Sequence, residues 1–460
     1  MLASLQGVVL IDDTQEDLDE LQKSLFRVGY PCLPIKYDNS DPGNVSGIDH
    51  VNLERVNSRV IITDLNLQEL QVDAKNLVAP IAEVLKTLNP LGPYILFFWS
   101  KNSSQVEGVM ELLAQRYYQE VPLPLYWGVL DKAEFKGNES NLSEKVKSLI
   151  EEGDIFHAVC NWENKVSNAA QGTINSLYQL ARPKPEEVTG DSFFRSKVKE
   201  NLQNMLAIIG NETLGQKNAK DTPGVAIELG LEPVLHNHLR DAYEPTDGTM
   251  WGIAVPNVGK KVMIHADLKA HLNSFYHIDD SLVDNSVQKR GTWVALSPEY
   301  FDDAKKQSKV KENFGKDLKV ILNEEFLNCA IGTKDERQKV RESLKIGFLE
   351  LSAECDQAQR KTKFHRYFLS VLIPIEHISH TYFRDNQSNV AHAGIYRLPQ
   401  LIINGKEYIV KVSFMYHIGV VPSSCKWLGK AVFRLKDQIL TEITFKASQH
   451  SSRPGIVSFN

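Results

Sequence analysis

The chain has 460 residues, of which 42% are apolar and 24% are charged, and its formal net charge is −6. This length exceeds that of a domain with a single hydrophobic core, so two or three globular domains are expected. No apolar run is long enough to span a bilayer, and the N-terminus lacks the basic start of a signal peptide. Five cysteines are scattered without close pairing, which is typical of reduced thiols and predicts a cytoplasmic protein.

The charge is divided unevenly along the chain. Residues 1–182 contain 15 Lys and Arg against 25 Asp and Glu, a net charge of −10. The remainder contains 37 against 33, a net charge of +4. The acidic first part argues against a nucleic-acid site there, and the C-terminal excess is too small to predict one.

The first third of the chain alternates between short apolar runs and amphipathic patterns. Five predicted strands lie at residues 7–13, 31–38, 58–64, 93–101 and 123–132. Helical spacing of apolar residues follows the first, third and fourth of these runs. Alternation of this kind predicts an α/β fold, with a doubly wound parallel five-stranded sheet covered by helices on both faces.

A domain boundary is expected after a helical segment. Residues 142–181 have a helical pattern, and "RPKPEE" at 182–187 is a stiff, helix-breaking linker. We therefore predict three parts: an α/β domain at 1–140, a helical connector and linker at 141–190, and a β-rich α+β domain at 191–460. In the last part, 192–215 predicts a helix, short apolar runs from "MWGIAVP" to "IVKVSFMY" predict strands, "INGKEY" predicts a hairpin turn, and 431–450 predicts a closing helix.

Chemically distinctive residues stand at the ends of the predicted strands. Asp12 and Asp13 end the first strand, Asp64 the third, Ser100 the fourth and Lys132 the fifth. The carboxyl ends of parallel strands meet at one edge of the sheet, where such folds place their active groups. These five side chains are therefore expected to converge.

Their chemistry predicts a magnesium-dependent phosphoryl acceptor. Clustered carboxylates repel one another, and Mg²⁺ binds such groups together with a backbone carbonyl, for which Asn66 is the candidate. Asp64 would then be the nucleophile toward a phosphoryl group, and Lys132 would neutralise its charge. The Ser100 hydroxyl would bind the phosphoryl oxygen. A structural alternative is that each Asp only ends its strand and caps the next helix.

The ordered segments "VVLIDD", "VIITDLNL", "ILFFWS" and "GVLDK" resemble the receiver (CheY-like) domain of two-component response regulators, over residues 5–150. The resemblance implies that Asp12 and Asp13 are the acidic pair, Asp64 the phosphoacceptor, Ser100 the switch residue and Lys132 the invariant lysine. It also implies Mg²⁺ as cofactor and a histidine kinase or GHKL-type ATPase as partner. The intervals between motifs are longer than in the family, and Ala133 stands where the family usually has proline.

Later segments resemble a second group of proteins. "NWENKVSNAAQGTINSLYQL", "LELSAECDQAQRK" and "SSRPGIVSF" are similar to stretches in large bacterial receiver-like proteins that occur beside ATPase or defence components. This resemblance implies an output or partner-binding role for the C-terminal part, not a particular reaction.

The C-terminal part shows no catalytic motif that we recognise. Cys355 with His365 could form a thiol nucleophile and base, but a buried structural cysteine is the favoured interpretation. "HNH" at 236–238 lacks the context of a nuclease. Residues 302–319 are basic but mixed in charge, which is typical of a solvated surface.

Three hypotheses follow for the whole protein. The first is a cytoplasmic signalling protein that accepts a phosphoryl group on Asp64 and relays its state to a C-terminal output domain. The second is a pseudo-receiver scaffold in a multiprotein assembly, such as an antiphage defence system. The third is a receiver-controlled enzyme acting on nucleic acid. We expect a switch or an interaction protein rather than a turnover enzyme.

Overall fold

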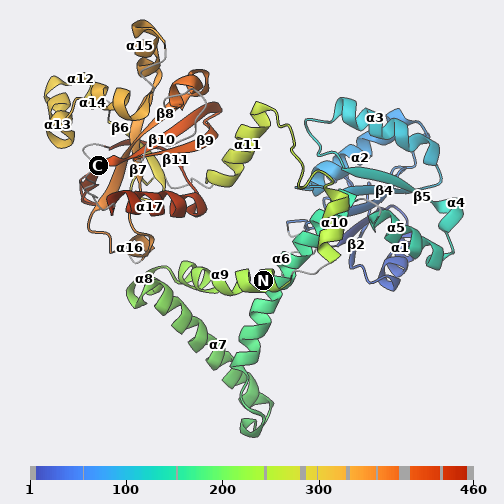
Figure 1. Ribbon diagram of the computed structural model, residues 1–460. Coiled ribbons are helices and arrows are strands. Elements are labelled where there is room, and N and C mark those ends of the chain that lie inside the picture. Colours follow the sequence, from blue (N-terminus) through green and yellow to red (C-terminus); the bar gives the residue numbers. More distant parts are fainter. Residues whose placement is uncertain are drawn as a thin grey trace. The chain divides into compact units, whose positions relative to one another are not determined.

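The computed structural model describes residues 7–54, 56–151, 154–242, 246–279, 286–297, 299–327, 332–358, 361–382, 394–424 and 428–452. The chain forms two compact units (Figure 1). The first unit lies within residues 1–202 and 231–261, and the second within 203–230 and 262–460. In the described ranges, no helix is both long enough and apolar enough to cross a membrane.

The first unit contains a five-stranded parallel sheet. Its strands are β1 (Val8–Asp12), β2 (Cys32–Lys36), β3 (Val60–Asp64), β4 (Ile95–Ser100) and β5 (Tyr126–Asp131), in the order β2-β1-β3-β4-β5. β1, β3 and β4 are buried along their whole length. Their sequences are continuous apolar runs because both of their faces are covered.

Helices cover both faces of this sheet (Figure 1). They are α1 (Gln15–Arg27), α2 (Ala74–Leu88), α3 (Val106–Arg116) after the short η1 (Ser103–Gln105), α4 (Lys132–Phe135) and α5 (Glu139–Glu151). One apolar core joins the sheet to α2 and α3, and a second core joins the opposite face to α1 and α5. The predicted α/β class of this part is confirmed.

A long series of helices follows the sheet. It comprises α6 (Asp154–Ala181), η2 (Pro185–Glu187), α7 (Asp191–Leu214), α8 (Gln216–Asp221), α9 (Pro223–Asp241), α10 (Thr246–Ala254) and α11 (Ala266–His277). The prediction of strands from "MWGIAVP" onward is wrong at its start, because α10 is helical and packs on α6. A short apolar run does not distinguish a strand from a buried helix, and here tertiary packing decides.

The second unit contains a six-stranded antiparallel sheet. Its strands are β6 (Thr292–Leu296), β7 (Lys345–Glu350), β8 (His365–Pro374), β9 (Ile395–Ile403), β10 (Lys406–Val420) and β11 (Leu428–Arg434), in the order β11-β6-β7-β8-β10-β9. β9 and β10 are joined by Asn404 and Gly405, whose φ angles are 51° and 72°. Two consecutive positive φ angles are typical of a tight hairpin turn, so the predicted turn is confirmed.

Helices also cover the second sheet. They are α12 (Glu299–Asp302), α13 (Ala304–Phe314), α14 (Leu318–Ile321), η3 (Leu322–Phe326), α15 (Lys334–Ser343), α16 (Glu354–Ala358), η4 (Ile375–Thr381) and α17 (Asp437–Ser451). One core lies between the sheet and α13, α14, η3 and α15, and another between the sheet and α17.

Two further expectations for the second unit are corrected. The run "LKVILNEEF" forms α14 and η3 rather than a strand, since its apolar residues pack onto the sheet from outside. The closing helix begins at Asp437 rather than Ala431, because residues 428–434 pair with β6 as β11. Cys329 and Cys425 lie outside the described residues.

Candidate functional site

Two aspartates end neighbouring strands at the centre of the parallel sheet. Asp12 is the last residue of β1 and Asp64 the last residue of β3, and the β1–β3 register places them side by side. Asp12 Oδ1 accepts a hydrogen bond from Thr14 N at 2.8 Å, and Asp64 Oδ2 accepts one from Asn66 N at 2.7 Å. These local turns end both strands and fix the direction of each carboxylate.

The ammonium group of Lys132 joins the carboxylates. Lys132 follows β5 directly, at the start of α4, and is buried. Its Nζ lies 2.9 Å from Asp64 Oδ1, 3.0 Å from Asp12 Oδ2 and 2.8 Å from Asp17 Oδ2. Nζ donates hydrogen bonds to Asp12 and Asp17 and forms an ion pair with Asp64. We call Asp12, Asp17, Asp64 and Lys132 the Lys132 cluster.

Asp17 was not predicted as a site residue. It lies in the first turn of α1, where an acid is expected for helix stability alone. Its second oxygen, Oδ1, binds Nζ of Lys136 at 2.6 Å, so α1 is held to the segment after β5 by two lysines. Its position in the sequence could have indicated its role. Asp17 lies in the first turn of α1, which begins at the same edge of the sheet as Asp12.

Burial and charge set the protonation of the cluster. Burial raises the pKa of Asp12 to about 7, with the Asp64 charge adding to it, although Lys132 and the Thr14 N–H act in the opposite direction. Burial lowers the pKa of Lys132, but the charges of Asp64 and Asp12 outweigh it, and the net pKa is raised. Lys132 therefore stays protonated, and Asp12 is the group of the cluster that titrates near neutral pH.

β4 supplies Trp99 and Ser100 to the same edge. Trp99 pairs with Asp64 in the β3–β4 register, and its ring centroid lies 6.0 Å from Lys132 Nζ. Trp99 is fully buried, and its indole N–H has no hydrogen-bond partner among the described residues. Ser100 is also buried, and its Oγ accepts a hydrogen bond from Asn102 N at 3.1 Å.

The other two predicted ligands stand outside the Lys132 cluster. Asp13 is half-buried, and its Oδ1 accepts a 3.3 Å hydrogen bond from Thr14 Oγ1. The carbonyl of Asn66 accepts a hydrogen bond from Glu69 N at 3.2 Å, and its side chain bonds to the backbone of Leu70. The structure thus brings Asp12, Asp64 and Lys132 together, while Asp13 and Asn66 lie in the turns after β1 and β3, and Ser100 ends β4.

The donor types and the charge of this edge fit a hard divalent cation. The four acids Asp12, Asp13, Asp17 and Asp64 outnumber the two bases Lys132 and Lys136 at this edge. Asp12 and Asp64 keep free lone pairs, because each of their carboxylate oxygens has a single partner among the described residues. In the described part of the chain, however, no three His, Cys, Asp or Glu side chains are grouped as a ready metal site, and Lys132 lies between the two central carboxylates.

The candidates in the C-terminal part do not form a comparable cluster. His365 Nδ1 lies 3.0 Å from Glu350 Oε1, and both side chains are buried. Cys355 is on α16, and its side chain is outside what the structure describes. His236 and His238 are on α9, where His238 lies 3.4 Å from the hydroxyl of Ser176.

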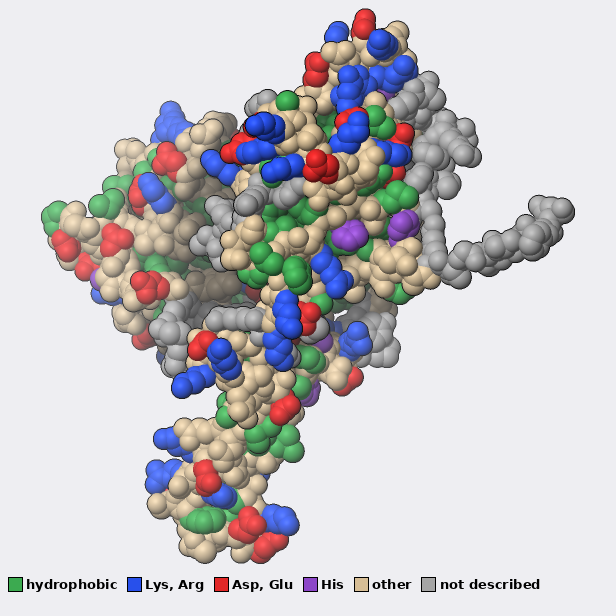
Figure 2. Space-filling view, turned by 90° about the vertical axis from the view of Figure 1, so that its left-hand side faces the viewer, with side chains coloured by type: hydrophobic (Ala, Val, Ile, Leu, Met, Phe, Trp, Pro, Cys, Tyr) green, Lys and Arg blue, Asp and Glu red, His purple; other side chains and the backbone are tan. Residues whose placement is uncertain are grey.

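The basic segment at 302–319 does not form a uniform surface. On the face drawn in Figure 2, Lys and Arg side chains are interspersed with Asp and Glu. On and after α13, Lys311 pairs with Asp317 and Lys316 pairs with Glu324. This distribution gives no particular support to a nucleic-acid interface.

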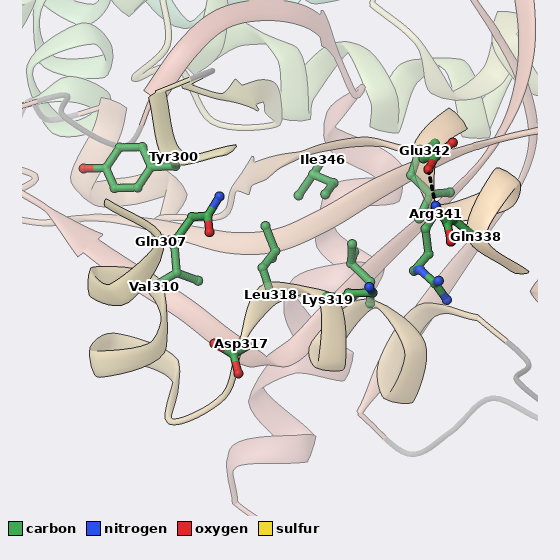
Figure 3. A pocket seen from close by; sticks show the side chains of 12 residues that line it. Tyr300, Gln307, Val310, Asp317, Leu318, Lys319, Gln338, Arg341, Glu342 and Ile346 are labelled. Atoms are coloured by element: carbon green, nitrogen blue, oxygen red, sulfur yellow. Dashed lines mark hydrogen bonds between the residues drawn. The ribbon is translucent and has the colours of Figure 1, made fainter. Parts of the chain in front are cut away.

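The second unit also has an open hollow of about 600 Å³ between β7 and the helices α13, α14 and α15. Figure 3 shows Leu318 and Ile346 at its centre, between Tyr300 on one side and Arg341 and Glu342 on the other. The hollow has the size of a small-molecule site. Its lining mixes the acids Asp317 and Glu342 with the bases Lys319 and Arg341, so its charge points to no single class of ligand.

Comparison with known proteins assigns the chain to no family. No protein-family model matches it, and no curated protein matches its sequence. The function must therefore be argued from the Lys132 cluster and the sheet that carries it.

Proposed function

We propose that the first unit is a receiver-like phosphoacceptor module in which Asp64 accepts a phosphoryl group. One observation carries the proposal: buried Lys132 bonds to Asp64 at 2.9 Å and to Asp12 at 3.0 Å, at the carboxyl ends of β1 and β3. The strand order β2-β1-β3-β4-β5 is the flavodoxin-like order, in which ligands bind at the switch point between β1 and β3. Asp12 and Asp64 flank that point.

The chemistry requires few groups. An Asp64 carboxylate oxygen attacks the phosphorus of an acyl phosphate or a phosphohistidine, and a new O–P bond forms. The bond from phosphorus to the donor breaks, and the donor leaves with the electron pair. Lys132 remains protonated, so its charge can follow the transferred phosphoryl oxygens without a proton transfer.

Mg²⁺ bound by Asp12, Asp13 and Asp64 would neutralise charge on the phosphoryl group. The gathering of acids around Lys132 supports this role, because carboxylate oxygens are ligands that Mg²⁺ prefers.

The proposed state change begins at the Lys132 cluster. A phosphoryl group on Asp64 takes over the bond of Asp64 to Lys132. The Ser100 hydroxyl, whose Oγ accepts from Asn102 N, donates its O–H to a phosphoryl oxygen. The second unit is the proposed output or partner-binding part of a cytoplasmic signalling protein. The proposed phosphoryl source is a histidine kinase or a GHKL-type ATPase.

The test is the intact mass of the full chain after incubation with Mg²⁺ and acetyl phosphate. We expect the parent protein to gain one phosphoryl mass and Asp64→Asn to gain none. Asp19→Asn, which changes an exposed aspartate of α1, is the matched control and should behave like the parent. A gain on Asp64→Asn equal to that of the parent would place the phosphoryl group elsewhere and refute the assignment.

A second candidate is a folded module that is not phosphorylated and acts as a scaffold in a multiprotein assembly. The observation that favours it is the contact of Lys132 with three carboxylates, with Asp17 as the third. If neither the parent nor Asp64→Asn gains mass while both stay folded in Mg²⁺, the scaffold is the function to pursue. The nucleic-acid enzyme has no comparable observation in its favour and stays a prediction from the sequence.

A further inference from the structure

Two basic side chains face each other on the second sheet, far from the Lys132 cluster in sequence. Lys411 on β10 pairs directly with Arg397 on β9 in the antiparallel register, so both project from the same face. Directly opposed residues have Cβ atoms roughly 4.5–5.5 Å apart, and like charges in this position destabilise a sheet. The pair therefore needs a physical explanation.

Lys411 is buried and incompletely satisfied. Only 6% of it is exposed, and its Nζ donates one hydrogen bond, to the carbonyl of Phe326 at 2.9 Å. That carbonyl ends the π-helical segment η3, a rare element that is frequent at functional sites. A protonated lysine has three N–H donors, so two remain without a partner among the described residues.

Arg397 has only hydroxyl partners. Its Nε and Nη2 both lie 3.3 Å from Thr381 Oγ1, and it also interacts with the side chain of Tyr382, whose ring centre is 5.1 Å from the guanidinium carbon. No carboxylate in the described ranges lies within 4.0 Å of the charged nitrogens of Arg397 or Lys411. The carboxylate of Glu325 is directed to Ser413 Oγ, at 3.5 Å.

We propose that Lys411 and Arg397 bind a small oxyanion, either free inorganic phosphate or the phosphate group of a small ligand. An oxyanion would accept the unused N–H groups of both side chains and replace their repulsion with attraction. Arg397 is only half-buried, which gives the anion an approach from its side of the sheet. This site is independent of the phosphoacceptor proposed at Asp64.

The experiment is calorimetric titration of inorganic phosphate into the full chain at constant ionic strength, with chloride as the reference salt. We expect the parent to bind phosphate, and Lys411→Met and Arg397→Gln to bind it roughly tenfold more weakly or worse, because a charged hydrogen-bond donor is lost. Lys406→Met removes an exposed lysine from the same strand and should bind like the parent. Arg397→Lys keeps the charge and should retain part of the affinity.

A second arm uses adenosine monophosphate. Binding of both ligands, weakened by Lys411→Met, would show that the site accepts a phosphate group on a larger ligand. Binding of inorganic phosphate alone would show a free-anion site. The proposal is overturned if the parent binds neither, or if Lys411→Met and Arg397→Gln bind phosphate as tightly as the parent. Methionine fills the buried position of Lys411 without a charge, so loss of binding can be separated from loss of folding by amide exchange in β9 and β10.

Discussion

Lys132 shows how much one buried charge can determine at the scale of a residue. Its ammonium group is bonded to three carboxylates that come from β1, α1 and β3. Without it, Asp12 and Asp64 would be buried side by side with no cation between them. Breaking a buried ion pair by removing one partner costs more than the pair contributes, because an uncompensated charge remains.

Replacement of Lys132 by methionine is therefore expected to destabilise the first unit by about 3 kcal/mol. Lys136→Met is the matched control, since Lys136 binds the same Asp17 but its side chain is 37% exposed, and an exposed pair contributes roughly 0–1 kcal/mol. Amide exchange in β1 and β3 reports the local free energy of unfolding. Equal effects of the two variants would contradict the central position that we give to Lys132.

Lys411 predicts a pH dependence of stability in the second unit. Burial, with a smaller contribution from Arg397, lowers the pKa of Lys411 to about 7 in the folded protein, against about 10.4 when unfolded. Between these values the unfolded chain binds the additional proton, so the free energy of unfolding rises with pH, by up to about 1.4 kcal/mol per pH unit. Below pH 7 lysine is protonated in both states, and its contribution no longer changes.

The measurement is urea unfolding of the second unit at several pH values from 7 to 9, in phosphate-free buffer. The difference in unfolding free energy between the parent and Lys411→Met should shift in favour of the parent as pH rises. Lys406→Met should follow the parent over the same range. A parallel pH dependence in the parent and Lys411→Met would show that Lys411 has an ordinary pKa and is not the titrating group.

At the scale of an element, β7 illustrates close packing against its neighbour. A Cβ atom built on Gly347 would lie 2.3 Å from the carbonyl oxygen of Val294 on β6 and 2.6 Å from the ring of Trp293. That ring is held in place, because its Nε1 donates a hydrogen bond to Ser370 Oγ at 2.9 Å and its face stacks on Phe433. Neither neighbour can move without breaking the sheet.

Gly347→Ala is accordingly expected to lower the unfolding free energy of the second sheet by roughly 1–3 kcal/mol, the usual cost of overpacking. Gly419→Ala on β10 is the matched control, because nothing lies within 4 Å of its added Cβ. Amide exchange should be faster in β6 and β7 of Gly347→Ala and unchanged in β1 and β3, which belong to a different core. If amide exchange in Gly347→Ala were as slow as in Gly419→Ala, β6 and β7 would have accommodated the added methyl group without loss of stability.

The elements also show which features a sequence reveals. The strands of the first sheet were predictable because each is a short apolar run that ends at a turn or a polar residue, and in β1, β3 and β4 burial of both faces makes the run continuous. Asp12, Asp64 and Lys132 were predictable for the same reason, as they directly follow such runs. Asp17 and Trp99 were not, since an acid in a first helical turn and an aromatic in a core strand have ordinary structural roles. Their place beside Lys132 depends on strand order and register.

The segment from α10 to η3 was predicted less well for a different reason. Its apolar runs are short, and short runs of strands and of buried helices share the same pattern. "MWGIAVP" became helical against α6, and "LKVILNEEF" became helical against the second sheet. In both segments the structure depends on packing against a surface from a distant part of the chain, α6 for the first and the second sheet for the other.

At the scale of the whole molecule, the two units differ in charge as well as in fold. The net charge of −10 in residues 1–182 belongs to the part with the parallel sheet, and the slight positive excess belongs to the rest. Around the Lys132 cluster the acids favour cations, whereas Lys411 and Arg397 favour anions. The site proposed at Asp64 would need Mg²⁺ together with a phosphoryl donor, whereas the site proposed at Lys411 and Arg397 would bind an oxyanion without a metal ion.

The chain passes between the two units more than once. It leaves the first unit after residue 202, returns at 231 and leaves again after 261. On the ribosome, residues 203–230 of the second unit are thus synthesised before the first unit is complete. The rest of the second unit, residues 262–460, is synthesised only afterwards. A protein truncated at residue 202 would also lack α10, which packs on α6. Shortened versions of the first unit should therefore extend to residue 261.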